Sequence, residues 1–205
     1  MLLAIDTSAG TSVAVVDRER GILAELNEGD TRRHAEVIGI LIESALAQAA
    51  VPVTALSGVA VGMGPGPFTG LRVGIAAARA FALGIDRPTY PVVSHDAVAF
   101  GLTSSTLVVT DARRREVYWS AYRGIDEAGL PHRSAGPGLS PPDLLRDAVD
   151  EFESYARLDA EQVSAGALGM VAELMLLHGR PLASDTALYL RSPDVTPSTG
   201  PKRVS

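Results

Sequence analysis

The sequence predicts an α/β fold of mixed sheets flanked by helices, built twice along the chain. Short runs of β-branched and aliphatic residues, typical of strands, alternate with segments in which apolar residues recur at helical spacing. In addition, LLAIDTSAGTSVAVV and LVVTDARRREVYWSA align at a fixed offset that places Asp6 on Asp111. Each acid ends an apolar strand and is followed by a turn and a second strand. The alignment indicates a duplicated fold.

Length, composition and charge limit the class of protein. A chain of 205 residues with 46% hydrophobic residues suits one large domain or two small ones. Its formal net charge of −6 argues against coating nucleic acid by bulk electrostatics. The absence of cysteine excludes a disulfide framework and a thiolate metal site. We see no signal peptide and no apolar run of membrane-spanning length, and we expect a cytoplasmic protein without membrane contact.

The first half reads as strands and helices in alternation. Apolar runs predict strands at 1–5, 11–17, 21–26, 59–61, 89–92 and 106–111. Helical spacing predicts a helix at 33–49, a second that starts with Thr69 as its N-cap and ends before Gly84, and a third at 94–102. This order predicts an N-terminal subdomain at 1–104.

The second half reads as a shorter version of the same plan. A strand is predicted at 116–122, a Gly- and Pro-rich surface loop at 129–143, helices at 144–156 and 163–178, and a last strand at 188–190. Residues 105–191 therefore form the expected C-terminal subdomain, and 192–205 form a flexible tail.

The two aligned hairpins are candidates for a nucleotide site. In actin-like folds, two such hairpins face each other across a cleft and hold the phosphates of ATP. The candidate nucleotide or anion residues are Asp6, Thr7, Ser8, Arg72, Asp111, Arg113, Arg114 and Arg115. The second hairpin has three arginines where the first has Ser8, Ala9 and Gly10, so a phosphate cannot approach its backbone closely. This is poor for an ordinary ATPase cleft, and the alternative that both acids merely cap their turns stays open.

The glycine-rich stretch GMGPGPFTGLRVG, residues 62–74, raises the same question. It lacks the G-K-[ST] ending of a P-loop and the downstream acid of a dinucleotide-binding motif. Its glycines and prolines suit a tight turn into a helix. Arg72 is the exception, because a cation in the first turn opposes the helix dipole. We expect an acidic partner for it, such as Asp6 or Asp96, or an anionic ligand.

Two helices look too apolar for one chain. A helix that is apolar on nearly every side must be buried on every side. Small residues at four-residue spacing also let a second helix approach closely. The predicted dimer interface consists of Ile38, Leu41, Ile42, Ala45, Gly70, Gly74, Ala78 and Ala82. The alternative is that the two helices cover each other within the chain.

Other catalytic patterns are missing from the sequence. The histidines, at 34, 95, 132 and 178, are scattered without metal-binding spacing and are read as surface or loop residues. There is no G-x-S-x-G elbow and no thiol nucleophile. The sequence predicts no catalytic set and no metal site.

Four segments in a fixed order resemble a known family. AIDTS, GMGPGPFTGLRVGIAAARAFALG, TDARRREVYWSAY and ALYLR look like the TsaB family, also called YeaZ. The resemblance implies a duplicated actin-like, Hsp70-like ATPase fold with a degenerate nucleotide site. It also implies pairing through the two N-terminal helices with TsaD, the catalytic paralogue that carries metal-binding histidines. Such subunits work with the ATPase TsaE to modify adenosine 37 of ANN-decoding tRNAs.

The resemblance favours a non-catalytic scaffold or activating subunit. It implies contact with tRNA through the complex, no intrinsic cofactor beyond ATP or ADP at a subunit interface, and a homodimer when the chain is alone. The chain departs from the family at Pro67, where serine is frequent, and near 149–155, where an expected strand is not evident. The alternative is a free-standing small-molecule kinase or ATPase of the actin-like superfamily. A metallopeptidase, a third reading, has no ligands in the sequence.

Overall fold

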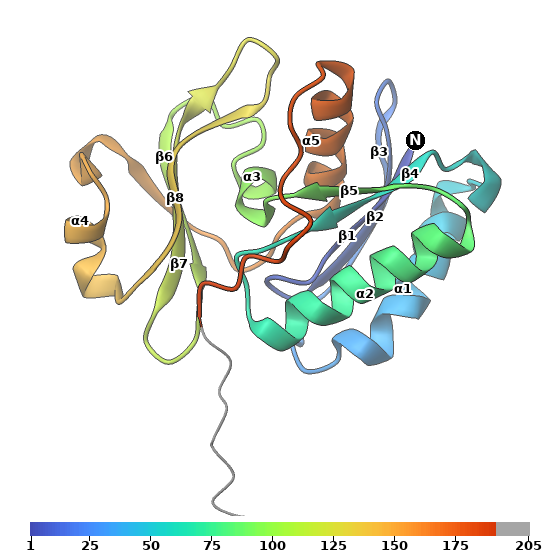
Figure 1. The fold of residues 1–205 in the computed structure, drawn as a ribbon, viewed down its shortest axis with the longest axis horizontal. Helices are drawn as coiled ribbons and strands as arrows, with labels where there is room; N and C mark the ends of the chain where they lie inside the picture. The colour runs from blue at the N-terminus through green and yellow to red at the C-terminus, as the bar shows by residue number, and fades with distance from the viewer. Residues whose placement is uncertain (192–205) are drawn as a thin grey trace, which may run out of the picture.

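The computed structural model describes residues 1–191 (Figure 1), and the tail expected at 192–205 lies outside the described residues. The first sheet contains β1 (Leu2–Asp6), β2 (Thr11–Asp17), β3 (Gly21–Glu28), β4 (Gly58–Gly62) and β5 (Thr89–Val92). Its order is β3-β2-β1-β4-β5. The first three strands are antiparallel neighbours, whereas β4 and β5 continue the sheet in parallel.

The second sheet repeats this plan. It contains β6 (Ser105–Asp111), β7 (Val117–Ile125), β8 (Pro131–Ser140) and β9 (Ala156–Asp159), in the order β8-β7-β6-β9. β6 and β7 pair antiparallel, as do β7 and β8, whereas β9 runs parallel to β6. The strands therefore correspond one to one with β1 to β4, which confirms the predicted duplication. Within residues 1–191, the second sheet has no counterpart of β5.

Helices cover both faces of the first sheet. α1 (His34–Ala49) and α2 (Phe68–Gly84) lie on one face, as Figure 1 shows. α5 (Ala165–Leu177) and α3 (Ser94–Val98) pack on the other. Because both faces are covered, β1 and β4 are buried along their whole length. This burial explains the apolar sequence of β4 and of β1 as far as Ile5.

The second sheet has a thinner covering. One face packs on α4 (Leu145–Ala148) and on Phe152, around Leu107, Val109 and Trp119. The other face contacts α3, so this short helix lies between the two sheets. The described part of the chain also holds three 3₁₀ turns, at Val53–Ala55, Pro142–Leu144 and Phe152–Ser154.

Several predicted elements are wrong. The surface loop predicted at 129–143 contains β8, an edge strand, where proline is tolerated because one side needs no ladder hydrogen bonds. Its glycines serve packing, since a Cβ at Gly138 would overlap the Trp119 ring. The helix predicted at 144–156 is reduced to one turn of α4, and the segment ends in β9. α2 begins at Phe68 without a side-chain cap, so Thr69 is not its N-cap.

The last described residues run along the first half as a strap, defined here as residues 183–191. The N–H of Ala183 donates to the Pro91 carbonyl, and that of Leu188 donates to the Met63 carbonyl. Asp185 pairs with Arg79 of α2 at 2.7 Å. The strand predicted at 188–190 is therefore wrong. α5 and most of the strap also belong in space to the first sheet, not to the expected C-terminal subdomain at 105–191.

Candidate functional site: the cleft between the two hairpin turns

The two hairpin turns face one pocket of about 300 Å³. Ser8 and Ala9 line it from the turn between β1 and β2. Asp111 and Arg113 line it from the corresponding turn between β6 and β7. The structure therefore brings together three of the predicted anion residues, Ser8, Asp111 and Arg113. Thr31, Pro67, Val109, Thr110, Val117, Asp159, Ala160 and Glu161 complete the lining.

Asp6 does not serve this pocket. Its carboxylate is buried and accepts hydrogen bonds from the N–H of Ser8 at 2.7 Å and from the Ser8 and Ser94 hydroxyls, both at 2.5 Å. Burial raises the pKa of Asp6, and these hydrogen bonds oppose that rise. The neighbouring Thr7 is also buried and donates to the Gly70 carbonyl at 2.8 Å. Asp6 and Thr7 therefore hold the turn against α2 and α3, as the capping alternative predicts.

The second turn is built differently. Asp111 is exposed and accepts a hydrogen bond from the N–H of Arg113 at 2.8 Å. Arg113, Arg114 and Arg115 have φ angles of 61°, 54° and 63°. The left-handed conformation costs an L residue about 1–2 kcal/mol. Three such residues in succession are a strained turn, and strain persists where the surroundings impose it.

Side-chain contacts of Arg113 and Arg191 help to hold this strained turn. Arg113 donates to the Thr31 hydroxyl at 2.6 Å and so reaches from the second half to the first. Arg191, at the end of the strap, donates to the Ala112 carbonyl at 2.8 Å and pairs with Glu116. The late ALYLR motif therefore ends in a residue that ties the strap to the second hairpin.

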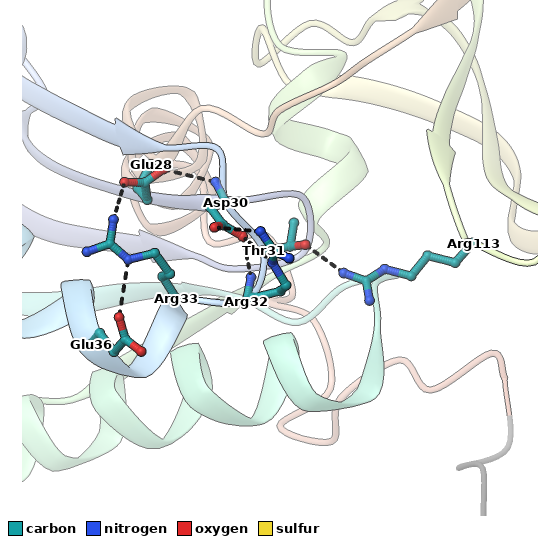
Figure 2. A network of polar contacts seen from close by, with 7 residues as sticks. All are labelled: Glu28, Asp30, Thr31, Arg32, Arg33, Glu36 and Arg113. Carbon is teal, nitrogen blue, oxygen red and sulfur yellow. Dashed lines mark hydrogen bonds and ion pairs between the residues drawn. The ribbon is translucent and has the colours of Figure 1, made fainter.

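Thr31 lies in a polar network just before α1 (Figure 2). Asp30 pairs with Arg32, and Arg33 pairs with Glu36 at 3.2 Å and with Glu28 at 3.7 Å. Exposed ion pairs of this kind contribute about 0–1 kcal/mol each. Their effect is to hold the loop in which Thr31 meets Arg113 (Figure 2).

The charges around the pocket do not fit a triphosphate with its metal. The lining contains one basic side chain, Arg113, and three acidic ones, Asp111, Asp159 and Glu161. Among residues 1–191, no group of three or more His, Asp or Glu side chains is placed to hold a metal ion. The repeat places Asp6 where an acid near the metal is expected, but its carboxylate already accepts hydrogen bonds from one amide and two hydroxyl groups. The lining therefore lacks the features of an ordinary ATPase site.

Arg72 has an aromatic partner instead of the expected acid. Its guanidinium lies 4.0 Å from the centroid of the Phe68 ring, a favourable cation–π distance. That ring in turn packs on Tyr189 of the strap, with the centroids 4.8 Å apart. Asp96 accepts a hydrogen bond from the Tyr122 hydroxyl at 2.7 Å and lies near Arg133. The expectation that Asp6 or Asp96 pairs with Arg72 is therefore wrong.

The predicted interface residues mostly face inward. Ile38, Ile42, Ala45, Gly70, Gly74, Ala78 and Ala82 are buried within the chain, and Leu41 is partly buried. A Cβ at Gly70 would lie 2.7 Å from the Thr7 carbonyl oxygen, and one at Gly74 would overlap the Thr7 side chain. The small residues thus let the β1–β2 turn approach α2. As a set of surface contacts the prediction is wrong for these seven residues.

Other side chains form the outer surface of these helices. Ile40 on α1 is 64% exposed, and Leu83 on α2 is 83% exposed. The helical repeat explains the exposure of Ile40, because this residue lies on the side of α1 opposite to the buried Ile38, Ile42 and Ala45. The sequence shows that both helices are apolar but not which side packs on the sheet.

A buried histidine was also missed. The ring of His95 lies between the two sheets, with Nδ1 2.8 Å from the Ser120 hydroxyl and Nε2 2.9 Å from the Thr110 hydroxyl. Burial, and then the charge of Arg133, lower its pKa to about 3. His34 is buried as well and contacts the Thr11 hydroxyl at 2.7 Å. The reading of these two histidines as surface residues is wrong.

Comparison with known proteins decides the family. The family model described as "TsaD: tRNA N6-adenosine threonylcarbamoyltransferase" matches residues 10–166. The chain belongs to this family. An uncharacterized protein of Mycobacterium tuberculosis is 40% identical over 203 residues, which covers 96% of this chain and 94% of that protein. The tRNA threonylcarbamoyladenosine biosynthesis protein TsaB of Escherichia coli is 28% identical over 88% of this chain and 80% of its own length.

Solved structures agree with this family assignment. YeaZ from Pseudomonas aeruginosa superposes with a TM-score of 0.74 at 27% identity, over 92% of this chain and 99% of its own. Together with the TsaB relatives, this confirms that the chain is TsaB-like, and the matching strand orders of the two sheets show its duplicated α/β fold. Within residues 1–191, no helix is long and apolar enough to cross a membrane.

Proposed function

We propose that the chain is a non-catalytic scaffold or activating subunit in threonylcarbamoyl modification of adenosine 37 of ANN-decoding tRNAs. Membership of the TsaD family and the TsaB relatives support a role in threonylcarbamoyladenosine biosynthesis. The positions of the histidines support a non-catalytic role, because the catalytic subunit TsaD is expected to bind a metal ion through histidines that lie close together. Here His34 and His95 are buried separately, each against hydroxyl groups.

The proposed partner is a TsaD-like transferase subunit. It would dock on the outer side of α1 and α2, where Ile40 and Leu83 leave large apolar side chains in water. Removal of exposed apolar side chains from water is the main favourable contribution to most protein–protein association. A TsaE-like ATPase and tRNA would then act through the assembled complex. In the absence of the partner, we expect the same outer side to form a homodimer.

Reconstitution with one component omitted at a time tests the proposed role. The chain is mixed with a TsaD-like subunit, a TsaE-like ATPase, tRNA, ATP and threonylcarbamoyl-adenylate, and modified adenosine is measured. We expect modification to be lost when this chain is left out. Modification that continues at the full rate without it would remove the proposed role.

A pair of matched variants tests the docking surface. Ile40→Glu places a charge on the outer side of α1 and is expected to abolish co-purification with the TsaD-like subunit. Ile125→Glu alters an exposed isoleucine on β7, far from this surface in the chain, and is expected to leave co-purification unchanged. Equal retention of the partner by both variants would contradict the assignment of the surface.

The pocket between the turns keeps the kinase or ATPase alternative testable. ATP hydrolysis by the purified chain is measured with and without the TsaD-like subunit, for the native chain and for Asp111→Asn. We expect no turnover by the chain alone, and ATP or ADP binding only when a second subunit completes the site. Turnover by the chain alone at an ordinary kinase rate, abolished by Asp111→Asn, would overturn the scaffold proposal.

A further inference from the structure

The two sheets differ at one edge. In the first sheet, β5 pairs in parallel with the outer side of β4. β9 has the position of β4 in the second sheet, but within residues 1–191 the order ends there. All residues of β9, Ala156–Asp159, are exposed. An open strand edge presents backbone groups that can pair with another strand.

The register shows which backbone groups are open. Arg157 lies opposite Leu107 of β6, and Asp159 lies opposite Val109. The N–H of Ala160 donates to the Val109 carbonyl, so residues of even number in this strand bond to β6. In a strand, alternate residues direct their N–H and C=O groups to opposite sides. The backbone groups of Arg157 and Asp159 therefore point to the open edge.

We propose that β9 pairs antiparallel with β9 of a second copy of this chain, around a two-fold axis at Leu158. In this register Arg157 lies directly opposite Asp159 of the second copy. By symmetry, Asp159 lies opposite Arg157 of the second copy. Both residues direct their N–H and C=O groups to the edge, so each pair exchanges two hydrogen bonds, as a hydrogen-bonded pair of an antiparallel ladder requires. The two sheets become one continuous sheet of eight strands.

The side chains are complementary to themselves in this register. Arg157 and Asp159 lie on the same face of β9, where they pair at 2.6 Å within the chain. Opposite charges directly across two strands stabilise pairing, and like charges oppose it. Each Arg157 guanidinium can thus turn to the carboxylate of the second copy. Leu158, 36% exposed, meets its own copy on the other face.

The contact is small, which sets its strength. Each copy contributes a strand of four residues. The surface that such a strand buries is far smaller than the roughly 800 Å² per partner of a stable complex. We therefore expect weak association that depends on concentration. Because β9 and α1 are separate surfaces, it is independent of the proposed docking on Ile40.

Cysteine cross-linking tests the register directly. The sequence contains no cysteine, so Leu158→Cys creates a single thiol. Across the axis the two Leu158 residues form a non-hydrogen-bonded pair, with Cα atoms about 4.5 Å apart, within the range of a disulfide. Ile22→Cys, on the exposed edge strand β3, is the matched control. Both variants carry Ile40→Glu to remove association through α1.

We expect disulfide dimers of Leu158→Cys to form at least about tenfold faster in air than those of Ile22→Cys, because pairing raises the effective thiol concentration. Equal rates would overturn the proposed register. Circular dichroism before oxidation shows whether each variant is folded.

The second test exchanges the charges of β9. Self-association of the full chain is measured by sedimentation equilibrium, and all variants carry Ile40→Glu. Arg157→Asp places like charges opposite each other and is expected to weaken self-association at least about fivefold. The double variant Arg157→Asp, Asp159→Arg restores opposite pairs and is expected to recover it. If the chain that carries Ile40→Glu alone is monomeric at all concentrations, or if the double variant does not recover association, the proposal is overturned.

Discussion

The two hairpin turns occupy equivalent places in the two sheets but are stabilised in different ways. Asp6 is buried under three hydrogen bonds, and Gly10 takes the left-handed conformation at φ 84°. Asp111 is exposed, and three arginines adopt the same unfavourable conformation after it. The first turn is held by buried contacts with Ser94 and Gly70. The second is held at the surface, by its own Arg113 on Thr31 and by Arg191 of the strap. Equal strand order therefore does not imply equal chemistry at the cleft.

The largest effect is expected when the two acids, Asp6 and Asp111, are each replaced by alanine. Asp6→Ala leaves the Ser8 amide and the Ser8 and Ser94 hydroxyls without their acceptor. We expect it to lower the free energy of unfolding by about 3 kcal/mol or more, since each buried unpaired group costs about 1–3 kcal/mol. Asp111→Ala is expected to cost at most about 1 kcal/mol, because the group is exposed. Urea denaturation measures both, and equal losses would contradict the contrast.

The next effect depends on pH and concerns His95, where the second sheet meets α3. Its pKa is about 3 in the folded chain, against 6.5 for the free side chain. Below pH 6.5 the unfolded chain binds the proton first, so stability falls as the pH drops from 6.5 toward 3. At pH 5 the loss from this group is about 2 kcal/mol.

Comparison of the native chain with His95→Gln separates this effect from the carboxylates. Burial raises the pKa of Asp6 and Asp96, and their contribution to stability increases as the pH falls through those raised values. We expect the native free energy of unfolding to fall more steeply than that of the variant between pH 6.5 and 5. Parallel curves would show that the imidazole is not held neutral.

A smaller loss is expected when the strap is released from the second turn. Arg191→Ala removes the hydrogen bond to the Ala112 carbonyl and the pair with Glu116. We expect a loss of about 1–2 kcal/mol in urea denaturation. Arg180→Ala, which breaks an exposed pair with Asp126, is the control and should cost less than about 0.5 kcal/mol. A loss no greater than the control would contradict the role of Arg191.

The smallest effect has the opposite sign in the two turns. Arg115→Gly allows φ 63° without a Cβ and is expected to stabilise the chain by about 0.5 kcal/mol. Gly10→Ala is expected to destabilise it, because its φ is 84° and the new Cβ would lie 2.9 Å from the Glu28 carbonyl oxygen. Thermal unfolding of both variants measures the two signs. A destabilising Arg115→Gly would show that the arginine itself holds the turn.

Much of the fold could be predicted from the sequence. The strands around Asp6 and Asp111 were recognisable because their apolar runs are bounded by turn residues, and the internal repeat identified the duplication. β8 could not be predicted in the same way, because its glycines and prolines are typical of loops. What makes it a strand is its place at the sheet edge against Trp119.

The candidate site shows the same division. Ser8, Asp111 and Arg113 were identified from their positions in the repeat, and they do line one pocket. The burial of Asp6 depends on Ser94, a residue 88 positions away, which no local pattern reveals. Gly70 and Gly74 allow close packing, but their partner is the Thr7 turn and not the second helix that the sequence suggested.

The sequence by itself determined the alternation of strands and helices, the duplication, the missing P-loop and the family, because these depend on local patterns and motifs. Only the tertiary structure decided which side of α1 and α2 is buried, that Arg72 meets Phe68 and that His95 lies between the sheets. It also decided that, within residues 1–191, the outer edge of β9 is open. These features depend on contacts between segments far apart in the chain. Such contacts arise from the packing of whole sheets and helices, which a single stretch of sequence does not encode.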